Sequence, residues 1–277
     1  MVLWSDPHIE RADSTKKLWP REKFERVVPE IVYSAVIQVV KGLWRYLGLR
    51  FTILGEANIP RRGGAVMAIN HIGYLDFAIA GTAALPARRL VRFMAKKQVF
   101  DHPISGPLMR GMKHISVDRE NGAPSYVEAL KALRDGEIVG VFPEATISRT
   151  FELKEMKSGV IRLAMDSGTP VIPTIVWGSQ RIWTKRQTRN FARNHFPITV
   201  AIGTPYSIAN DASIEMEMGR LREKMSELLT LAQANYPDIP NGEPWAPPRL
   251  GGTAPTAAQL EEIITAEKRE SEGRRKK

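Results

Sequence analysis

The sequence contains no cysteine. This absence excludes a disulfide framework, a catalytic thiolate and a metal site built on cysteine. The chain also has no serine with glycines on both sides at the spacing of a nucleophile elbow, the turn that carries the nucleophile of α/β hydrolases. The sequence therefore contains neither a cysteine nucleophile nor a serine nucleophile of this kind.

Long apolar runs are absent too, since no stretch approaches the roughly 20 residues needed to span a bilayer. Met1 to Asp6 lack the basic start and apolar core of a secretory signal, so we expect the chain to remain in the cytoplasm. Residues 31–49 come closest to a long apolar segment, and their apolar positions recur at helical spacing beside Trp44 and Tyr46. This pattern is equally typical of an amphipathic helix at a membrane interface and of one packed on the protein's own core.

The most informative stretch is Asn70-His71-Ile72-Gly73-Tyr74-Leu75-Asp76, which follows an apolar run at residues 65–69 typical of a buried strand. Gly73 allows a sharp turn, and the pattern beyond it predicts a helix from Tyr74 with Asp76 in its first turn. A carboxylate that reaches back to His71 fixes the tautomer of the ring and supports the imidazolium. The pair therefore predicts a general base acting on a substrate alcohol, although a His and an Asp at this spacing also occur in proteins without such chemistry.

Polar residues follow two further apolar runs. Phe142-Pro143-Glu144-Ala145-Thr146-Ile147-Ser148-Arg149 comes after residues 138–141, and its arginine offers a forked set of donors to phosphate oxygens. Asp118-Arg119 closes a block that starts at Gly111. A capped strand-to-helix loop and a surface salt bridge would produce the same two patterns without a ligand.

Apolar runs that alternate with helical patterns predict an α/β fold, in which a mostly parallel sheet is flanked by helices and preceded by the N-terminal amphipathic helix. Strands are expected at 51–55, 64–70, 91–95, 114–118, 137–142, 170–177 and 197–203. Helices are expected near 30–48, 74–85, 103–112, 124–134, 156–167 and 213–234. The polar blocks then fall beyond the carboxyl ends of strands, where sites in such sheets gather.

The composition changes after Tyr236. Five prolines and three glycines between residues 237 and 252 predict an extended linker, followed by a short charged helix near 257–270 and a mobile basic end. We therefore divide the chain into an N-terminal segment (1–50), a catalytic domain (51–236) and a linker with a charged tail (237–277).

Positive charge is concentrated in two segments. Residues 85–119 hold eight Lys or Arg against two Asp, and residues 181–194 hold five against no acidic residue. Such segments attract anionic partners such as lipid headgroups, phosphate-bearing substrates or acidic proteins. Trp183 and Phe191 among these charges suit a membrane interface or single-stranded nucleic acid.

In order and spacing, these blocks resemble those of the glycerolipid acyltransferases with a His-x4-Asp motif, most closely the 1-acyl-sn-glycerol-3-phosphate (lysophosphatidic acid) acyltransferases. Residues 70–76, 111–119 and 142–148 are similar to the first three family blocks, and Val171-Ile172-Pro173-Thr174 is similar to the fourth. The resemblance covers roughly residues 30–235.

The resemblance implies transfer of a fatty acyl group from acyl-coenzyme A or acyl-carrier protein to the sn-2 hydroxyl of lysophosphatidic acid, which gives phosphatidic acid for phospholipid synthesis. It implies that His71 is the general base and that Asp76 orients it. It also implies that the acceptor is held by some or all of Arg119, Glu144, Thr146, Ser148, Arg149, Lys96 and Lys157. No metal, resident cofactor or nucleic acid is implied, and the expected location is the cytoplasmic face of the cell membrane, peripheral or monotopic, on anionic lipid.

Two positions depart from the family pattern. Ala145 replaces the usual glycine of the third block, and Ile147 stands where the family usually has an arginine. The second change leaves open another acceptor for the same chemistry, such as glycerol 3-phosphate, another lysophospholipid or a glycolipid. A protein without catalytic activity, which binds a membrane surface or nucleic acid through its basic segments, is the alternative outside the enzymes.

Overall fold

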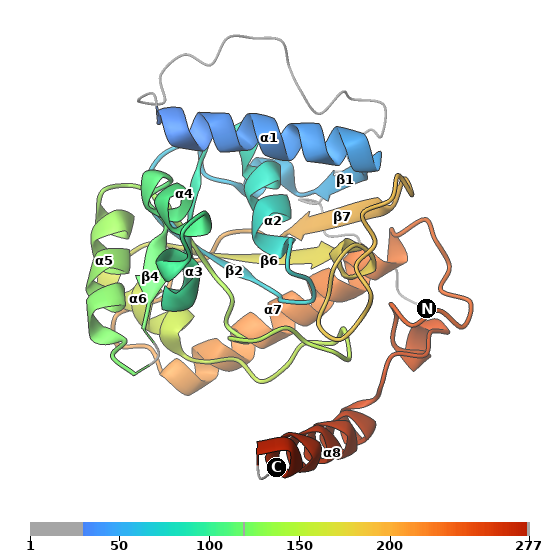
Figure 1. Cartoon of the computed structure of the whole chain (residues 1–277). Coiled ribbons are helices and arrows are strands. Elements are labelled where there is room, and N and C mark those ends of the chain that lie inside the picture. Colours follow the sequence, from blue (N-terminus) through green and yellow to red (C-terminus); the bar gives the residue numbers. More distant parts are fainter. Residues whose placement is uncertain (1–29, 119, 276–277) are drawn as a thin grey trace, which may run out of the picture.

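The computed structural model describes residues 30–118 and 120–275, and seven strands in these ranges form one sheet (Figure 1). The strands are β1 (Arg50–Leu54), β2 (Ala65–Ile69), β3 (Val91–Lys96), β4 (Ile115–Val117), β5 (Ile138–Val141), β6 (Val171–Trp177) and β7 (Pro197–Ile202). The α-helices are α1 (Ile31–Leu47), α2 (Asp76–Ala84), α3 (Lys97–Asp101), α4 (Ser105–Gly111), α5 (Ala123–Arg134), α6 (Gly159–Ser167), α7 (Ile214–Ala234) and α8 (Ala257–Arg275).

The strand order β1-β7-β6-β2-β5-β3-β4 places β2 between β6 and β5. Neighbouring strands are parallel except β6 and β7, which are antiparallel. The carboxyl ends of β6, β2, β5 and β3 therefore meet at one edge of the sheet, and the segments that leave these strands start close together. The predicted α/β fold with a mostly parallel sheet is confirmed.

Helices cover both faces of the sheet (Figure 1). Val66 and Ala68 of β2 pack in the core that contains α5, α6 and α7. Ala65, Met67 and Ile69 of the same strand point the other way, into the core with α1 and α2. Because both faces are covered, β2 has five consecutive buried apolar residues instead of an alternating pattern.

The predicted strands are all present in the structure, and so are the predicted helices, with some changes at their ends. Helix α2 begins at Asp76, later than expected, because the residues before it form a turn around the Asp76 carboxylate. Likewise α6 begins at Gly159 instead of near 156. The short helix α3 was not predicted.

The Pro/Gly-rich segment after Tyr236 differs from the expected extended linker. Trp245, Ala246 and Ala254 are buried in the same core as α7. Arg249 also pairs with Glu152, with 2.6 Å between Nε and Oε1. This segment is therefore packed against the preceding domain, while the domain boundary at residue 236 stays a prediction.

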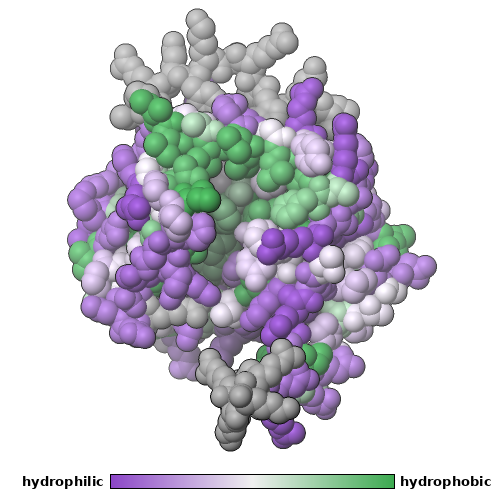
Figure 2. Space-filling view, viewed as in Figure 1, coloured by the Kyte–Doolittle hydropathy of each residue, from purple (hydrophilic) through white to green (hydrophobic). Residues whose placement is uncertain are grey.

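An apolar groove runs between α1 and α2, above β3. Its lining includes Val36 and Val40 of α1, Phe77 of α2 and Phe93 of β3. Exposed apolar side chains of α1, α2 and α4 surround the groove, and we call this surface the apolar face. It is the green band with a hollow beneath it in Figure 2. Its residues are Ile31, Val32, Val39 and Tyr46 of α1, Phe77 of α2, and Ile104 and Leu108 of α4. None of the helices in residues 30–118 and 120–275 combines the length and apolar character that a bilayer crossing requires.

Helix α1 uses part of its apolar surface inside the protein. Tyr33, Trp44 and Leu47 are buried against the sheet or α4, whereas Val39 and Tyr46 face outward. Of the two expected uses of this helix, packing on the protein's own core is confirmed. Its contact with a membrane stays a prediction.

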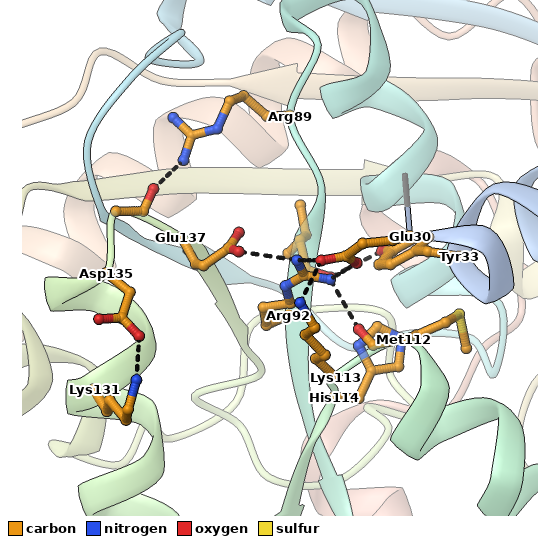
Figure 3. A network of polar contacts seen from close by, with 12 residues as sticks. Glu30, Tyr33, Arg89, Arg92, Met112, Lys113, His114, Lys131, Asp135 and Glu137 are labelled. Atoms are coloured by element: carbon orange, nitrogen blue, oxygen red, sulfur yellow. Dashed lines mark hydrogen bonds and ion pairs between the residues drawn. The ribbon is translucent and has the colours of Figure 1, made fainter. Parts of the chain in front are cut away.

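A buried arginine fixes the start of α1 to the amino-terminal edge of the sheet (Figure 3). Arg92, which is 2% exposed, donates from both terminal nitrogens to the Glu30 carboxylate at 2.6 Å and from Nη2 to Glu137 at 2.9 Å. Its Nη1 also donates to the carbonyl of Met112 at 2.9 Å. Since Glu30 precedes α1 and Glu137 precedes β5, one guanidinium holds three parts of the chain together.

We expect Arg92→Leu to lower the free energy of unfolding by about 3–5 kcal/mol, because the Glu30 and Glu137 carboxylates would lose the guanidinium that they share in a poorly hydrated site. The matched control is Lys97→Met, which breaks the exposed pair with Asp101 and should cost no more than about 1 kcal/mol. Urea unfolding at neutral pH measures both values. Equal losses in the two variants would contradict a structural role for the Arg92 network.

Candidate active site

The Asp76 carboxylate organises the turn between β2 and α2. It is fully buried at the first position of α2, where the helix dipole favours negative charge. Its Oδ2 accepts hydrogen bonds from the backbone N–H groups of Ile72 at 2.7 Å and Gly73 at 2.8 Å, and lies 3.0 Å from Nδ1 of His71. The structure thus brings His71 and Asp76 together, as the spacing predicts, and their catalytic roles stay predictions.

The second oxygen of Asp76 is held by a residue that sequence reasoning missed. Oδ1 accepts a hydrogen bond from the hydroxyl of Ser179, which is fully buried and lies just after β6. A Cβ atom on Gly73 would lie 2.8 Å from the Ser179 hydroxyl oxygen, so this close approach requires glycine at position 73. Ser179 also follows an apolar run, the strand predicted at 170–177, and this position beyond a strand end is the signal in the sequence that points to it.

The His71 ring is placed to exchange a proton on one side only. Asp76 accepts from Nδ1–H, a tautomer assigned from the hydrogen-bond network, so Nε2 points away as the proton acceptor. One face of the ring lies against Phe142, with 4.5 Å between ring centroids, and 22% of the side chain is exposed. The backbone is fixed as well, because its carbonyl accepts from the Ser148 N–H at 2.7 Å.

Glu144 lies inside the protein and supports the His71 backbone. One carboxylate oxygen accepts from the His71 N–H at 3.0 Å and the other from the Lys154 N–H at 3.2 Å. Burial raises the pKa of the Glu144 carboxyl from 4.5 to about 7, and these two hydrogen bonds oppose the rise. The observed contacts are those of a positioning residue, and direct contact between Glu144 and a substrate stays a prediction.

The side chains of Thr146 and Ser148 also make internal contacts. The Thr146 hydroxyl accepts a hydrogen bond from Nζ of Lys154, and the Ser148 hydroxyl donates to the carbonyl of Glu152 at 2.7 Å. These contacts stabilise the loop after β5, which lies beside His71.

The structure explains one of the two departures from the family pattern, Ile147, but not the other, Ala145, whose backbone would suit the usual glycine better. Ala145 has a φ of 57°, in the left-handed region that favours glycine. Ile147 is buried, so an apolar side chain suits its position.

The remaining predicted site residues lie in three different settings. Lys96 ends β3 and is exposed, as is Lys157, whose N–H donates to the Pro143 carbonyl at 2.9 Å. Arg149 instead forms an ion pair with Glu267 of α8. Arg119 lies outside the described residues, so its predicted role is not tested.

The sequence of this region is similar to that of known acyltransferases. Residues 50–177 match the Acyltransferase family. This match agrees in position with the four motif blocks, and the resemblance predicted from them is confirmed. A 1-acyl-sn-glycerol-3-phosphate acyltransferase of Bacillus subtilis is 34% identical over 127 residues, which are 46% of this chain and 62% of that protein.

Two further acyltransferases extend this comparison. A 1-acyl-sn-glycerol-3-phosphate acyltransferase of Limnanthes douglasii is 31% identical over 169 residues, 58% of this chain and 57% of that protein. The alignments thus span about six tenths of the length of these curated relatives. The crystal structure of the 1-acyl-sn-glycerophosphate acyltransferase PlsC from Thermotoga maritima superposes with a TM-score of 0.59 at 18% identity, covering 76% of this chain and 92% of that one. The superposition supports the shared fold.

The raised pKa of Glu144 makes stability depend on pH. Because this carboxyl ionises less readily in the folded chain, its contribution to stability is complete below pH 4.5 and is lost as the pH rises to about 7. We expect the unfolding free energy of the wild type, relative to Glu144→Gln, to fall by about 3 kcal/mol across this range. Urea unfolding at several pH values from 4 to 8 tests this, since the other groups titrate in both proteins. A constant difference between the two proteins would refute the shift.

Proposed function

We propose that this acyltransferase transfers a fatty acyl group from acyl-coenzyme A or acyl-carrier protein to the sn-2 hydroxyl of lysophosphatidic acid, as a 1-acylglycerol-3-phosphate O-acyltransferase. The observation that carries the proposal is the buried Asp76 carboxylate that holds the His71 ring at the carboxyl edge of the sheet. The names of the Bacillus and Limnanthes relatives support lysophosphatidic acid as the acceptor.

The proposed reaction is a direct transfer. Nε2 of His71 takes the proton of the acceptor hydroxyl while its oxygen attacks the thioester carbonyl. Asp76 stabilises the imidazolium that forms. As the C–S bond breaks, the imidazolium returns the proton to the leaving thiolate, so the products are an ester and a free thiol.

The apolar lining of the groove beside α1 suits an acyl chain, and its volume of about 40 Å³ in this structure requires the groove to widen when the chain binds. Phe93 lines this groove and stacks on Phe142 at 6.4 Å between ring centroids, and Phe142 in turn lies against His71. A continuous set of rings therefore connects the general base to the apolar lining. We propose that an acyl chain in the groove directs its thioester along these rings toward His71.

We propose that the apolar face contacts the membrane. Its side chains belong to α1, α2 and α4, which surround the mouth of the groove (Figure 2). Basic residues of α1 and of the end of β3, namely Lys41, Arg45 and Lys96, suit anionic headgroups. We place this face on the cytoplasmic surface of the cell membrane, where a lipid acceptor and an acyl chain can enter from the bilayer without a spanning helix.

One observation favours an acceptor other than lysophosphatidic acid. Ile147 is buried at the position where the family usually has an arginine, so the acceptor phosphate lacks that partner. Glycerol 3-phosphate, another lysophospholipid or a glycolipid would then be acylated by the same chemistry.

Replacement of the general base tests the proposal. We expect His71→Ala to reduce acyl transfer from palmitoyl- and oleoyl-coenzyme A to lysophosphatidic acid by about 10² to 10⁴. The control is His102→Ala, which removes an exposed histidine between α3 and α4. Glycerol 3-phosphate and lysophosphatidylinositol, assayed in parallel, identify the acceptor. Full activity of His71→Ala would exclude the general-base mechanism. Product from another acceptor alone would change the assigned acceptor and leave the mechanism in place.

We expect Ser179 to affect the catalytic rate by positioning the Asp76 carboxylate. We expect Ser179→Ala to lower kcat by about 10- to 100-fold with little change in KM, because one hydrogen bond to a charged group that orients the base is lost. Ser179→Thr keeps the hydroxyl and should recover much of the rate. Steady-state kinetics with the preferred acceptor separate the two constants. Equal loss in both variants would point to packing around position 179 instead of the hydrogen bond.

A further inference from the structure

A carboxylate from the C-terminal helix occupies a cluster of cations next to the active site. Glu267 of α8 lies 3.2 Å from Nη1 of Arg149 and 3.4 Å from Nη2 of Arg186. Lys185 joins these two arginines in lining a cavity of about 480 Å³ between the domain and α8. Arg149 and Arg186 are 37 residues apart in the sequence, so the fold brings them to one carboxylate.

Both arms of this cluster are anchored to the turn that holds the general base. The N–H of Ser148, the residue before Arg149, donates to the His71 carbonyl at 2.7 Å. The hydroxyl of Thr184, just before Lys185, donates to the Ile72 carbonyl at 2.6 Å. Arg149 and Lys185 therefore each follow a residue that is hydrogen-bonded to the His71 turn.

The contacts of α8 are those of a part that can detach. Most of its described side chains are exposed, and those that line the cavity are Gln259, Glu262 and Ile263. Arg186 is 61% exposed, so its pair with Glu267 is weak, whereas Arg149 on the same carboxylate is 14% exposed. By contrast, the segment before α8 is fixed through buried Trp245 and Ala254, which keeps the helix close to the cavity when it leaves.

We propose that Arg149, Lys185 and Arg186 form a binding site for a phosphate group and that Glu267 of α8 covers this site in the free protein, so that phosphate and α8 compete for it. The inference rests on the proposed function, because the phosphate is that of a substrate: the headgroup of the acceptor or the coenzyme A part of the donor. A phosphate monoester carries more charge than one carboxylate and offers three oxygens to the forked donors of arginine. Release of α8 also removes Glu262 from the cavity.

Removal of the competing carboxylate should expose the site. We expect Glu267→Gln to tighten binding of the ligand by about 5- to 10-fold, the gain that follows if α8 covers the site about 80–90% of the time. The matched control is Glu270→Gln, which removes the same charge from an exposed position of the same helix and should leave the affinity unchanged. Adding Arg186→Gln to Glu267→Gln should abolish the gain.

Titration calorimetry with two soluble probes distinguishes the sources of the phosphate. Glycerol 3-phosphate represents the acceptor headgroup, and adenosine 3′,5′-bisphosphate represents the nucleotide part of coenzyme A. Tighter binding of either probe by Glu267→Gln supports the site and assigns it to that substrate. Unchanged affinity for both probes overturns the proposal.

Limited trypsin digestion of the full chain tests displacement of α8 separately. The bound probe should make cleavage within α8 faster in the wild type but not in Glu267→Gln, where the helix is already released. Protection of α8 by the probe would contradict competition. Because neither readout depends on acyl transfer, an inactive protein that shows both effects would refute the proposed function and leave this site intact.

Discussion

The fold of the active-site region depends on the burial of one negative charge. A fully buried carboxylate is tolerated only when donors satisfy its oxygens, and Asp76 draws them from the Ile72 and Gly73 N–H groups, the His71 ring and the Ser179 hydroxyl. The two backbone donors require the chain to turn tightly after β2. The Ser179 hydroxyl requires the segment after β6 to approach this turn, which leaves room only for glycine at position 73. The position of the His71 ring follows from these constraints, so the arrangement that satisfies the buried carboxylate is also the one that the proposed proton transfer requires.

A second buried charge stabilises the opposite edge of the sheet. Arg92 lies near the start of β3 and pairs with Glu137 before β5 and with Glu30 before α1 (Figure 3). The sheet is thus divided between an amino-terminal edge held by an ion-pair network and a carboxyl-terminal edge that carries the candidate site. Because the network also fixes the start of α1, it determines where one wall of the apolar groove lies, and so couples the stabilising edge to the surface proposed to bind the acyl chain.

What could be predicted from the sequence was mostly local. The strands were recognisable as apolar runs, and the five-residue spacing of His71 and Asp76 was enough to predict their contact, because the intervening turn is short. Ser179 and Glu267 were not found, since they lie 103 and 118 positions from Asp76 and Arg149 and only the strand order and the path of the C-terminal segment bring them close. The packing of Trp245 was missed for a related reason: prolines and glycines indicate an irregular backbone, which can be buried as well as extended. The internal role of Glu144 was hidden because its partners are backbone N–H groups, which every residue has.

The third motif block shows how one loop can redistribute a charge. The left-handed backbone at Ala145 sets the course of the loop after β5, and the next positions divide between the interior and the rim. Ile147 is buried and the Ser148 hydroxyl binds a backbone carbonyl, whereas the Arg149 guanidinium reaches the carboxylate of Glu267. An arginine at position 147 would have to leave the interior or be buried there with its charge, so the cation of this loop is carried two positions later. This cation therefore lies in the cavity under α8, where it pairs with a carboxylate of the same chain and where we propose that a substrate phosphate competes for it.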